Sequence, residues 1–186
     1  MSNTARPPLT RDDLERKLRE SFEWRGADSK ADMSRWWRDP DVLRSVGASL
    51  AELHTESDPN VIVGIASQGF LLGPLAAVVL GVGFVEVERN LAEATTGGGV
   101  IRRTTPPDYA GRSIVMGIRR GAVSPGQRAL LVDDWIETGA QARAARRLIE
   151  DSGGKWLGAS VIVDAASHST RRDLNVRSIL RVGELG

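Results

Sequence analysis

The sequence predicts an α/β fold, a mainly parallel twisted sheet with helices on both faces. Two observations support this prediction. Short β-branched runs alternate along the chain with apolar segments that suit helices, and 186 residues are enough for about one domain. Within a single domain spanning 1–186, we expect residues 1–60 to form N-terminal helices and a hood, and residues 61–186 to form the α/β core.

The N-terminal segment is charged and rich in aromatic residues. Arg11 to Glu20 and Asp41 to His54 each have the pattern of a helix. Between these two segments lie Phe22, Trp24, Trp36 and Trp37. We expect these aromatic side chains to pack as core, although a hood that stacks over a planar ligand is the alternative.

The core elements alternate in the order that a parallel sheet requires. Val61–Ile65 suits a buried strand, Phe70 to Leu80 suits a helix, and Gly81 to Glu88 begins the next strand. A second series of strand, helix and strand is predicted at 129–134, 142–151 and 157–164. In such sheets, ligands bind beyond the carboxyl ends of the strands.

The composition excludes several classes of function. The chain has 25 Lys and Arg against 24 Asp and Glu, a balance that disfavours a nucleic-acid coat. It has no cysteine, which excludes thiol chemistry and makes a cytoplasmic setting the expectation. With two histidines, a divalent metal would rest on oxygen ligands, which favours Mg²⁺. No apolar run approaches the roughly 20 residues of a membrane span, and the polar N-terminus does not resemble a secretory signal.

Basic residues concentrate in one stretch of the chain. Residues 89–128 contain seven basic and two acidic residues, a net charge of +5 in a nearly neutral protein. Within it, about 95–112 is rich in Gly, Thr and Pro and carries Arg102, Arg103 and Arg112. We expect this segment to be a flexible lid, with a plain solvated loop as the alternative.

The most informative motif follows the strand predicted at 129–134. Asp133 and Asp134 stand at its carboxyl end, where their oxygens can bind paired hydroxyls or Mg²⁺. Residues 137–141 then open a helix, whose first amide groups favour a phosphate. A ribose phosphate would satisfy both halves. The alternative is that the acids only end a strand and the glycine only makes a turn.

This whole arrangement resembles the signature of the type I phosphoribosyltransferases, which have a Rossmann-like fold and bind 5-phosphoribosyl-1-pyrophosphate (PRPP). Gly64–Ala76 with Leu80–Val85, and also Ser124–Arg128, are similar to segments of the adenine phosphoribosyltransferases. The likeness covers roughly residues 40–186. It implies transfer of the 5-phosphoribosyl group from PRPP to a purine-like base, adenine-type first, with release of pyrophosphate. It also implies a Mg²⁺ cofactor, a role in purine salvage and a homodimer.

The resemblance assigns roles to individual residues. Asp133 and Asp134 would bind the ribose hydroxyls and the metal, and Glu137 and Asp134 would be catalytic. The 5-phosphate would be held by Glu137, Thr138, Gly139, Ala140 and Gln141. The pyrophosphate loop would be Ala66, Ser67, Gln68 and Gly69. The cations on the diphosphate would be Arg102, Arg103 and Arg89, the last at a position where family members often serve a neighbouring subunit.

The sequence also departs from the adenine-type pattern. Gln68 replaces an arginine, Gln141 replaces a hydroxyl residue, and Asp108–Arg112 stands where the lid would carry a glutamate near the base. Glu137 aligns with an aspartate that approaches N7 of the base in 6-oxopurine enzymes, so it could exchange a proton there; the alternative is that it faces solvent.

Three further residues receive structural expectations. Trp135 replaces an aliphatic residue and is expected to pack, and His54 and His168 are expected at the surface or at helix ends.

A second class of function stays open. The altered pyrophosphate loop and the missing lid glutamate would also suit a non-catalytic regulatory protein that binds PRPP or a nucleotide. No helix-turn-helix segment precedes the core, which weakens a DNA-binding version of this hypothesis.

Overall fold

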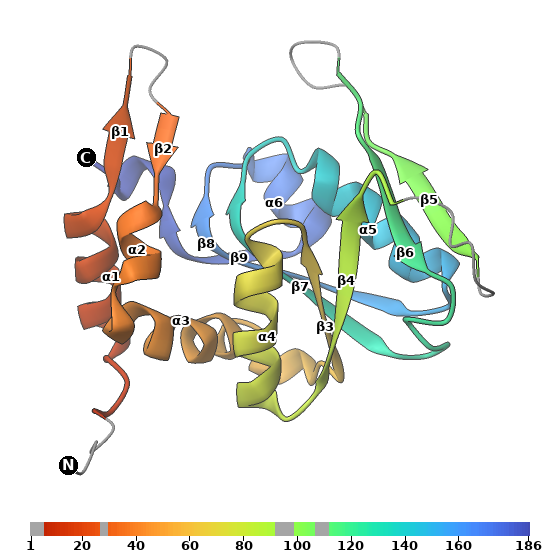
Figure 1. Ribbon diagram of the computed structural model, residues 1–186, viewed down its shortest axis with the longest axis horizontal. Helices are drawn as coiled ribbons and strands as arrows, with labels where there is room; N and C mark the ends of the chain where they lie inside the picture. Colours follow the sequence, from red (N-terminus) through yellow and green to blue (C-terminus); the bar gives the residue numbers. More distant parts are fainter. Residues whose placement is uncertain (1–5, 27–29, 92–98, 107–111) are drawn as a thin grey trace.

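A seven-stranded sheet forms the centre of the protein, in a computed structural model that describes residues 6–26, 30–91, 99–106 and 112–186 (Figure 1). Five strands run parallel: β4 (Gly83–Arg89), β3 (Val61–Ile65), β7 (Arg128–Ile136), β8 (Lys155–Asp164) and β9 (Val176–Arg181). Beside β4, the antiparallel strands β6 (Val115–Arg119) and β5 (Val100–Thr104) complete the sheet. The predicted mainly parallel sheet is therefore confirmed.

Helices cover both faces of the sheet, as predicted. One face packs against α3 (Pro40–Glu52) and α4 (Gly69–Leu80), and the other against α5 (Ala140–Asp151) and α6 (His168–Leu174). Strand β3 shows why both layers are needed, because all five of its residues are buried. Since side chains alternate along a strand, Val61 and Val63 enter the core under α5, while Ile62 enters the core under α4.

The N-terminal segment packs on the α3–α4 side of the sheet. It contains α1 (Arg11–Ser21), a hairpin of β1 (Glu23–Arg25) and β2 (Lys30–Asp32), and the short α2 (Ser34–Arg38). The Thr10 side chain caps α1 by accepting from the Asp13 N–H. Trp36 is completely buried and its indole N–H donates to the Leu18 carbonyl at 3.0 Å. The two predicted helices and the core role of Trp36 are confirmed, whereas the hairpin was not predicted.

The predicted loop at about 95–112 is wrong over residues 100–104. Residues 100–104 form β5, which pairs with β6 along its whole length, for example Val100 with Arg119 and Thr104 with Val115. Pairing with a neighbouring strand satisfies the backbone and outweighs a loop-like local composition. Residues 95–98 and 107–111 of the expected lid lie outside the described residues.

His54 and His168 both lie at helix ends, as expected, but His54 is not at the surface. His54 is fully buried, and neither ring nitrogen has a hydrogen-bond partner among the described residues. The ring lies against Gly158 of β8, where a Cβ would approach His54 Cε1 to 2.6 Å, so the missing side chain makes room for it. Burial lowers the pKa of His54, because a buried imidazolium loses its hydration. His168 is exposed at the first position of α6.

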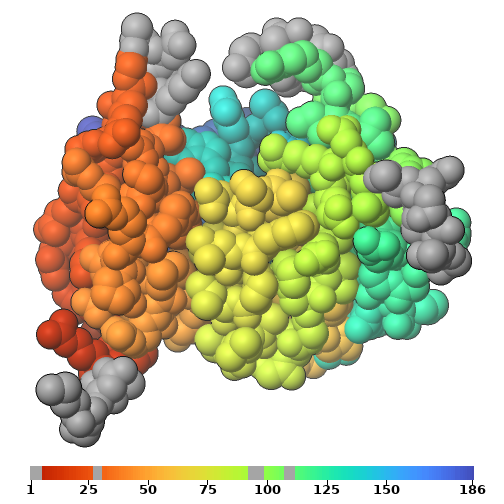
Figure 2. Space-filling view, in the orientation of Figure 1, coloured from red at the N-terminus to blue at the C-terminus, as the bar shows by residue number. Residues whose placement is uncertain are grey.

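The sheet order places two loops together at the carboxyl edge. Strands β3 and β7 are parallel neighbours, paired from Val61–Ala129 to Gly64–Val132. The loop from β3 to α4 and the turn from β7 to α5 therefore leave the sheet side by side. Figure 2 shows the molecule hollowed at this edge, between the N-terminal hairpin and the β5–β6 pair. None of the described helices is long and apolar enough to cross a membrane.

Candidate active site

A cavity of about 380 Å³ opens at the carboxyl edge of the sheet. Four parts of the chain line it: the β3–α4 loop, the end of β7, the start of α5, and the β4 and β5–β6 side. The residues that matter below are Ala66, Ser67, Gln68, Arg89, Thr105, Arg112, Asp133, Asp134, Trp135, Glu137, Thr138, Gly139, Ala140 and Gln141. Most of the residues that the sequence assigned to ligand binding thus lie around one cavity.

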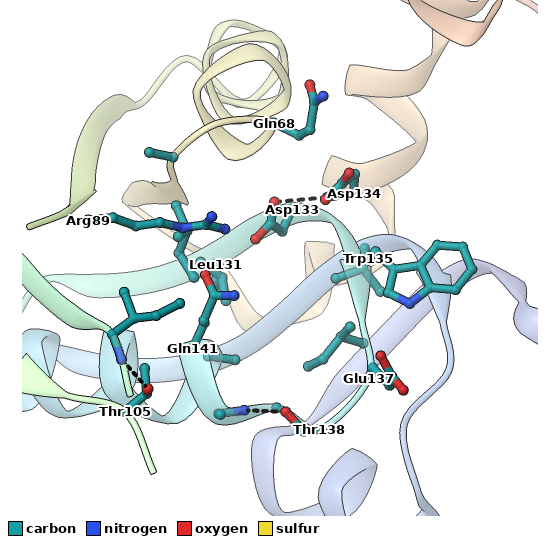
Figure 3. A pocket seen from close by; sticks show the side chains of 18 of the residues that line it. Gln68, Arg89, Thr105, Leu131, Asp133, Asp134, Trp135, Glu137, Thr138 and Gln141 are labelled. Carbon is teal, nitrogen blue, oxygen red and sulfur yellow. Dashed lines mark hydrogen bonds between the residues drawn. The ribbon is translucent and has the colours of Figure 1, made fainter. Parts of the chain in front are cut away.

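Two adjacent carboxylates occupy the middle of the cavity. Asp133 and Asp134 are half-buried near the end of β7, and the Asp134 N–H donates to Asp133 Oδ1 at 3.0 Å (Figure 3). Burial raises the pKa of Asp133 well above its usual value, and the neighbouring Asp134 charge raises it further. Burial also raises the pKa of Asp134. The site therefore concentrates acceptor oxygens that gain from a cation or from hydroxyl donors.

The turn between β7 and α5 offers amide groups beside these acids. Gly139 precedes α5 with φ of 72°, in the left-handed region that favours glycine. A Cβ there would lie 2.6 Å from Thr170 Cγ2, so the turn is held closely against α6. The first N–H groups of a helix have no acceptor within it and favour an anion. No acidic side chain stands in the first turn of α5 to occupy that position.

The loop between β3 and α4 contacts the sheet through two glycines. A Cβ on Gly64 would lie 2.3 Å from the Gly69 carbonyl oxygen, so α4 starts almost in contact with β3. This places Ala66, Ser67 and Gln68 in the cavity, while Gly69 itself does not line it. The Ala66–Ser67 peptide bond is cis, and the Ala66 N–H donates to the Val87 carbonyl at 3.1 Å. The predicted pyrophosphate loop therefore faces the cavity with three of its four residues.

The cations around the cavity differ from those expected. Arg89, at the end of β4, lines the cavity of its own chain and extends toward Asp133 (Figure 3). Its positive charge lowers the pKa values of Asp133 and Asp134 against the effect of burial. Arg112 also lines the cavity.

Arg102 and Arg103 were predicted to bind substrate, but the structure does not bring them to the cavity. The Arg102 guanidinium donates to the Leu91 carbonyl at 2.9 and 3.0 Å, and Arg103 pairs with Asp151 of α5 at 2.6 Å. The reason is strand geometry: these residues belong to β5, whose pairing with β6 fixes their directions.

One end of the cavity is aromatic and acidic. Trp135 lines it and also contacts the N-terminal segment: its ring lies 6.4 Å from Phe22, nearly parallel, and 6.1 Å from Trp24, edge to face. Glu137 is exposed, lines the same cavity, and lies below Trp135 in Figure 3. Trp37 packs against the core instead. The N-terminal segment therefore contacts one residue that lines the cavity, Trp135, for which the sequence predicted only a packing role.

Several lining residues were missed at the sequence level. Thr105 and Ile114 both line the cavity. The Thr105 N–H donates to the Ile114 carbonyl at 2.9 Å, and the Ile114 N–H donates to Thr105 Oγ1 at 3.0 Å. No local motif marks these two residues. Trp135 could have been found, because it directly follows the acid pair at a strand end, where ligands bind.

The donor set is compatible with Mg²⁺ bound together with a phosphorylated ligand. Among the described residues, no three His, Asp or Glu side chains gather as a metal cage. Mg²⁺ characteristically takes one or two protein carboxylates and completes its shell with water and phosphate oxygens. Asp133 and Asp134 supply those two carboxylates, beside amides that suit a phosphate. The cavity can thus accommodate a sugar bearing phosphates, with an aromatic wall for a planar group.

Comparison with known proteins gives a consistent result. Residues 38–182 match the model of the phosphoribosyl transferase domain. The adenine phosphoribosyltransferase of Prochlorococcus marinus (strain MIT 9313) is 36% identical over 145 residues, 78% of this chain and 81% of the relative. That of Desulfitobacterium hafniense (strain Y51) is 32% identical over 143 residues, 77% of this chain and 80% of the relative.

Solved structures agree with these relatives. The adenine phosphoribosyltransferase of Saccharomyces cerevisiae, crystallised with an imino-altritol bisphosphate and adenine, superposes with a TM-score of 0.75 at 27% identity. The superposition covers 91% of this chain and 99% of the yeast chain. The enzyme from Leishmania donovani gives a TM-score of 0.76 at 26% identity, over 93% of this chain and 81% of that chain.

Proposed function

The chain belongs to the phosphoribosyl transferase domain family, and on that premise we propose that it transfers the 5-phosphoribosyl group of PRPP to a purine-like base with release of pyrophosphate. The observation that carries this proposal is the single cavity that joins the Asp133–Asp134 pair to the amide-lined turn 137–141. A ribose phosphate needs both at once. The named relatives act on adenine, which makes an adenine-type base the first candidate and purine salvage the role.

Asp133 and Asp134 hold the ribose hydroxyls and, together with the substrate, a Mg²⁺ ion. Their raised pKa values support this role, because hydroxyl donors and a cation stabilise the charged form that burial disfavours. A bound Mg²⁺ ion would supply positive charge to the departing pyrophosphate. The two carboxylates fix the ribose between the base and the leaving group.

The two ends of PRPP are held by the two loops. Thr138, Gly139, Ala140 and Gln141 surround the 5-phosphate, and Ala66, Ser67 and Gln68 with Arg89 face the pyrophosphate. The proximity of Arg89 to the acid pair supports this arrangement, since the pair lies between the two loops. Preorganised donors of this kind stabilise charge as it develops on a leaving group.

Glu137 is the proposed proton acceptor. As C1′ of the ribose loses its bond to the pyrophosphate oxygen, that electron pair leaves with pyrophosphate and a ring nitrogen of the base forms the new bond. The base must then lose a proton. The exposed Glu137 carboxylate lines the cavity below Trp135, where a base stacked on the indole would lie.

A second copy of the chain is the proposed partner, in a cytoplasmic setting consistent with the absence of cysteine. Helix α4 is apolar on every side and contains no charged residue. Val78 is 81% exposed and Val79 55% exposed on its outer face. Helices that are apolar all round are normally buried, so a homodimer that covers this face would remove an unfavourable exposure.

The test is pyrophosphate release and product mass with PRPP, Mg²⁺ and a panel of purine-like bases. We expect release with at least one base, loss of release with EDTA, and a fall of at least about 100-fold in the Asp133→Asn/Asp134→Asn double variant. Glu86→Gln, an exposed acid on β4 outside the cavity, is the matched control and should keep full activity.

Two results would contradict the proposal. Normal turnover in the double variant would remove the acid pair from the mechanism. Binding of PRPP without release for every base would favour a non-catalytic regulatory protein instead.

A further inference from the structure

Arg143 lies behind the phosphate turn, outside the cavity, and connects it to α6. Its guanidinium donates to three acceptors: Nη1 to the Thr138 carbonyl at 2.9 Å, Nη2 to Thr170 Oγ1 at 3.2 Å, and Nε to Asp173 Oδ2 at 3.0 Å. Arg143 itself is not among the residues that line the cavity, whereas Thr138, which it holds, is. Arg143 can therefore influence a bound molecule through the turn.

The geometry of one peptide bond shows how that influence would act. The Thr138–Gly139 peptide bond is trans. In a trans peptide, the C=O and the following N–H point in opposite directions. By holding the Thr138 carbonyl, Arg143 directs the Gly139 N–H away from itself. The planar guanidinium fork of an arginine, with several donors in fixed directions, restrains such a carbonyl better than the ammonium of a lysine does.

The other side of the turn is also braced by α6. A Cβ on Gly139 would lie 2.6 Å from Thr170 Cγ2 and 2.8 Å from Leu174 Cδ1. Thr170 in turn is held by the N-cap residue Ser167, whose hydroxyl accepts from its N–H at 3.2 Å. The turn therefore packs against α6, and Arg143 is bonded to that same helix through Thr170 and Asp173.

We propose that Arg143, with Thr170 and Asp173 of α6, is a positioning residue that presets the turn 138–141 for the 5-phosphate. This inference rests on the proposed function, in which that turn binds the 5-phosphate of PRPP. Asp173 forms an ion pair with Arg143 at 3.0 Å, and the solvent that reaches both side chains weakens the long-range effect of the guanidinium charge. Orientation of the turn, rather than net charge, is therefore what Arg143 contributes.

The experiment compares two probes that occupy opposite ends of the proposed site. Ribose 5-phosphate and pyrophosphate, each with MgCl₂, are titrated calorimetrically into the wild type and Arg143→Met, and steady-state kinetics with PRPP are measured in parallel. Arg143→Met should weaken ribose 5-phosphate binding about tenfold, roughly the value of one charge-assisted hydrogen bond. Pyrophosphate binding should stay within about twofold. KM for PRPP should rise about tenfold, with kcat changed far less.

Arg147→Met is the matched control. Arg147 stands four residues further along α5, is exposed, and is not among the residues that line the cavity. This variant should bind both probes as the wild type does. Arg143→Lys keeps the charge without the fork and should remain at least about threefold weaker than the wild type for ribose 5-phosphate. Asp173→Asn weakens the bond that α6 makes to Arg143, and it should also weaken ribose 5-phosphate binding.

Different outcomes would contradict the positioning role of Arg143 and the proposed function. If the wild type binds ribose 5-phosphate and Arg143→Met binds it equally well, the positioning role is overturned while the proposed function stands. An equal loss for both probes, full rescue by Arg143→Lys, or tighter binding in Asp173→Asn would also overturn it. A wild type that binds neither ribose 5-phosphate nor PRPP contradicts the proposed function itself, and this inference with it.

Discussion

Single side chains decide the charge of this site. Asp133 and Asp134 bring two acids into a half-buried position, and Arg89 offsets them from the end of a different strand. In the pyrophosphate loop, Gln68 stands where the adenine-type pattern has an arginine, so this end has less positive charge than that pattern. Both features lead to predictions that a single substitution can test.

The acid pair should destabilise the unliganded protein at neutral pH. Because burial raises the pKa of Asp133 above its unfolded value, ionisation costs the folded state. The cost is absent below the unfolded pKa and grows as the pH rises toward the folded pKa. Asp133→Asn should therefore raise Tm at pH 7.5, by about 2–4 °C for each kcal/mol relieved, and by less near pH 4. Thermal denaturation at both pH values checks this.

A Tm gain that is equal at both pH values would contradict the electrostatic explanation. PRPP with Mg²⁺ provides an internal control, since it should raise Tm of the wild type and not of the variant.

Gln68→Arg should strengthen the pyrophosphate end of the site. Gln68 lines the cavity at the start of α4, and an arginine can form charge-assisted bonds to phosphate oxygens that an amide cannot. We expect KM for PRPP to fall by about three- to tenfold in steady-state assays. Gln68→Met, which keeps the length without polarity, should not lower KM. An unchanged KM in Gln68→Arg would place this side chain away from the diphosphate.

At the scale of elements, the site depends on close approaches that glycines permit. Helix α4 starts against β3 through Gly64 and Gly69, and the turn before α5 rests on α6 through Gly139. Phe22 and Trp24 of the N-terminal segment pack against Trp135, which lines the same cavity. Each functional loop is thus positioned by packing between two elements.

Gly64→Ala should disrupt the β3–α4 contact. The added Cβ would lie 2.3 Å from the Gly69 carbonyl oxygen, a backbone atom that can move only if α4 shifts. We expect a loss of about 1–3 kcal/mol in the free energy of unfolding, measured by urea denaturation, together with a raised KM for PRPP. Gly83→Ala, in the adjacent strand β4, meets nothing within 4 Å and should be tolerated. Equal stability of the two variants would contradict this packing argument.

At the scale of the whole molecule, the face formed by α4 is apolar and exposed. Figure 2 shows α4, in yellow, on the face turned toward the viewer. Val78→Glu would place a charge on the proposed dimer face, so we expect a monomer by size-exclusion chromatography with light scattering. Arg147→Glu, an exposed position on α5, is the control and should remain dimeric. A wild type that is monomeric at micromolar concentration, or a Val78→Glu variant that stays dimeric, would contradict the proposed homodimer.

Although β5, β6, β9 and α6 were not predicted, the sequence by itself determined the parallel strands β3, β4, β7 and β8, the helices α4 and α5, and the acid pair with its turn. These features are local: a strand such as Val61–Ile65 is evident from its own residues, and the 133–141 motif is contiguous. Parallel order at a sheet edge then brings 66–68 and 137–141 together, so much of the candidate site could be predicted.

Only the tertiary structure decided which distant side chains join the cavity. Arg89 lines it and Arg102 and Arg103 do not, because pairing of β5 with β6 sets their directions. Trp135 contacts Phe22 and Trp24, and His54 is buried against Gly158. Arg143 donates to Thr138, Thr170 and Asp173. These contacts join residues from separate elements, so their energies depend on how the sheet and helices pack, which no local pattern of sequence encodes.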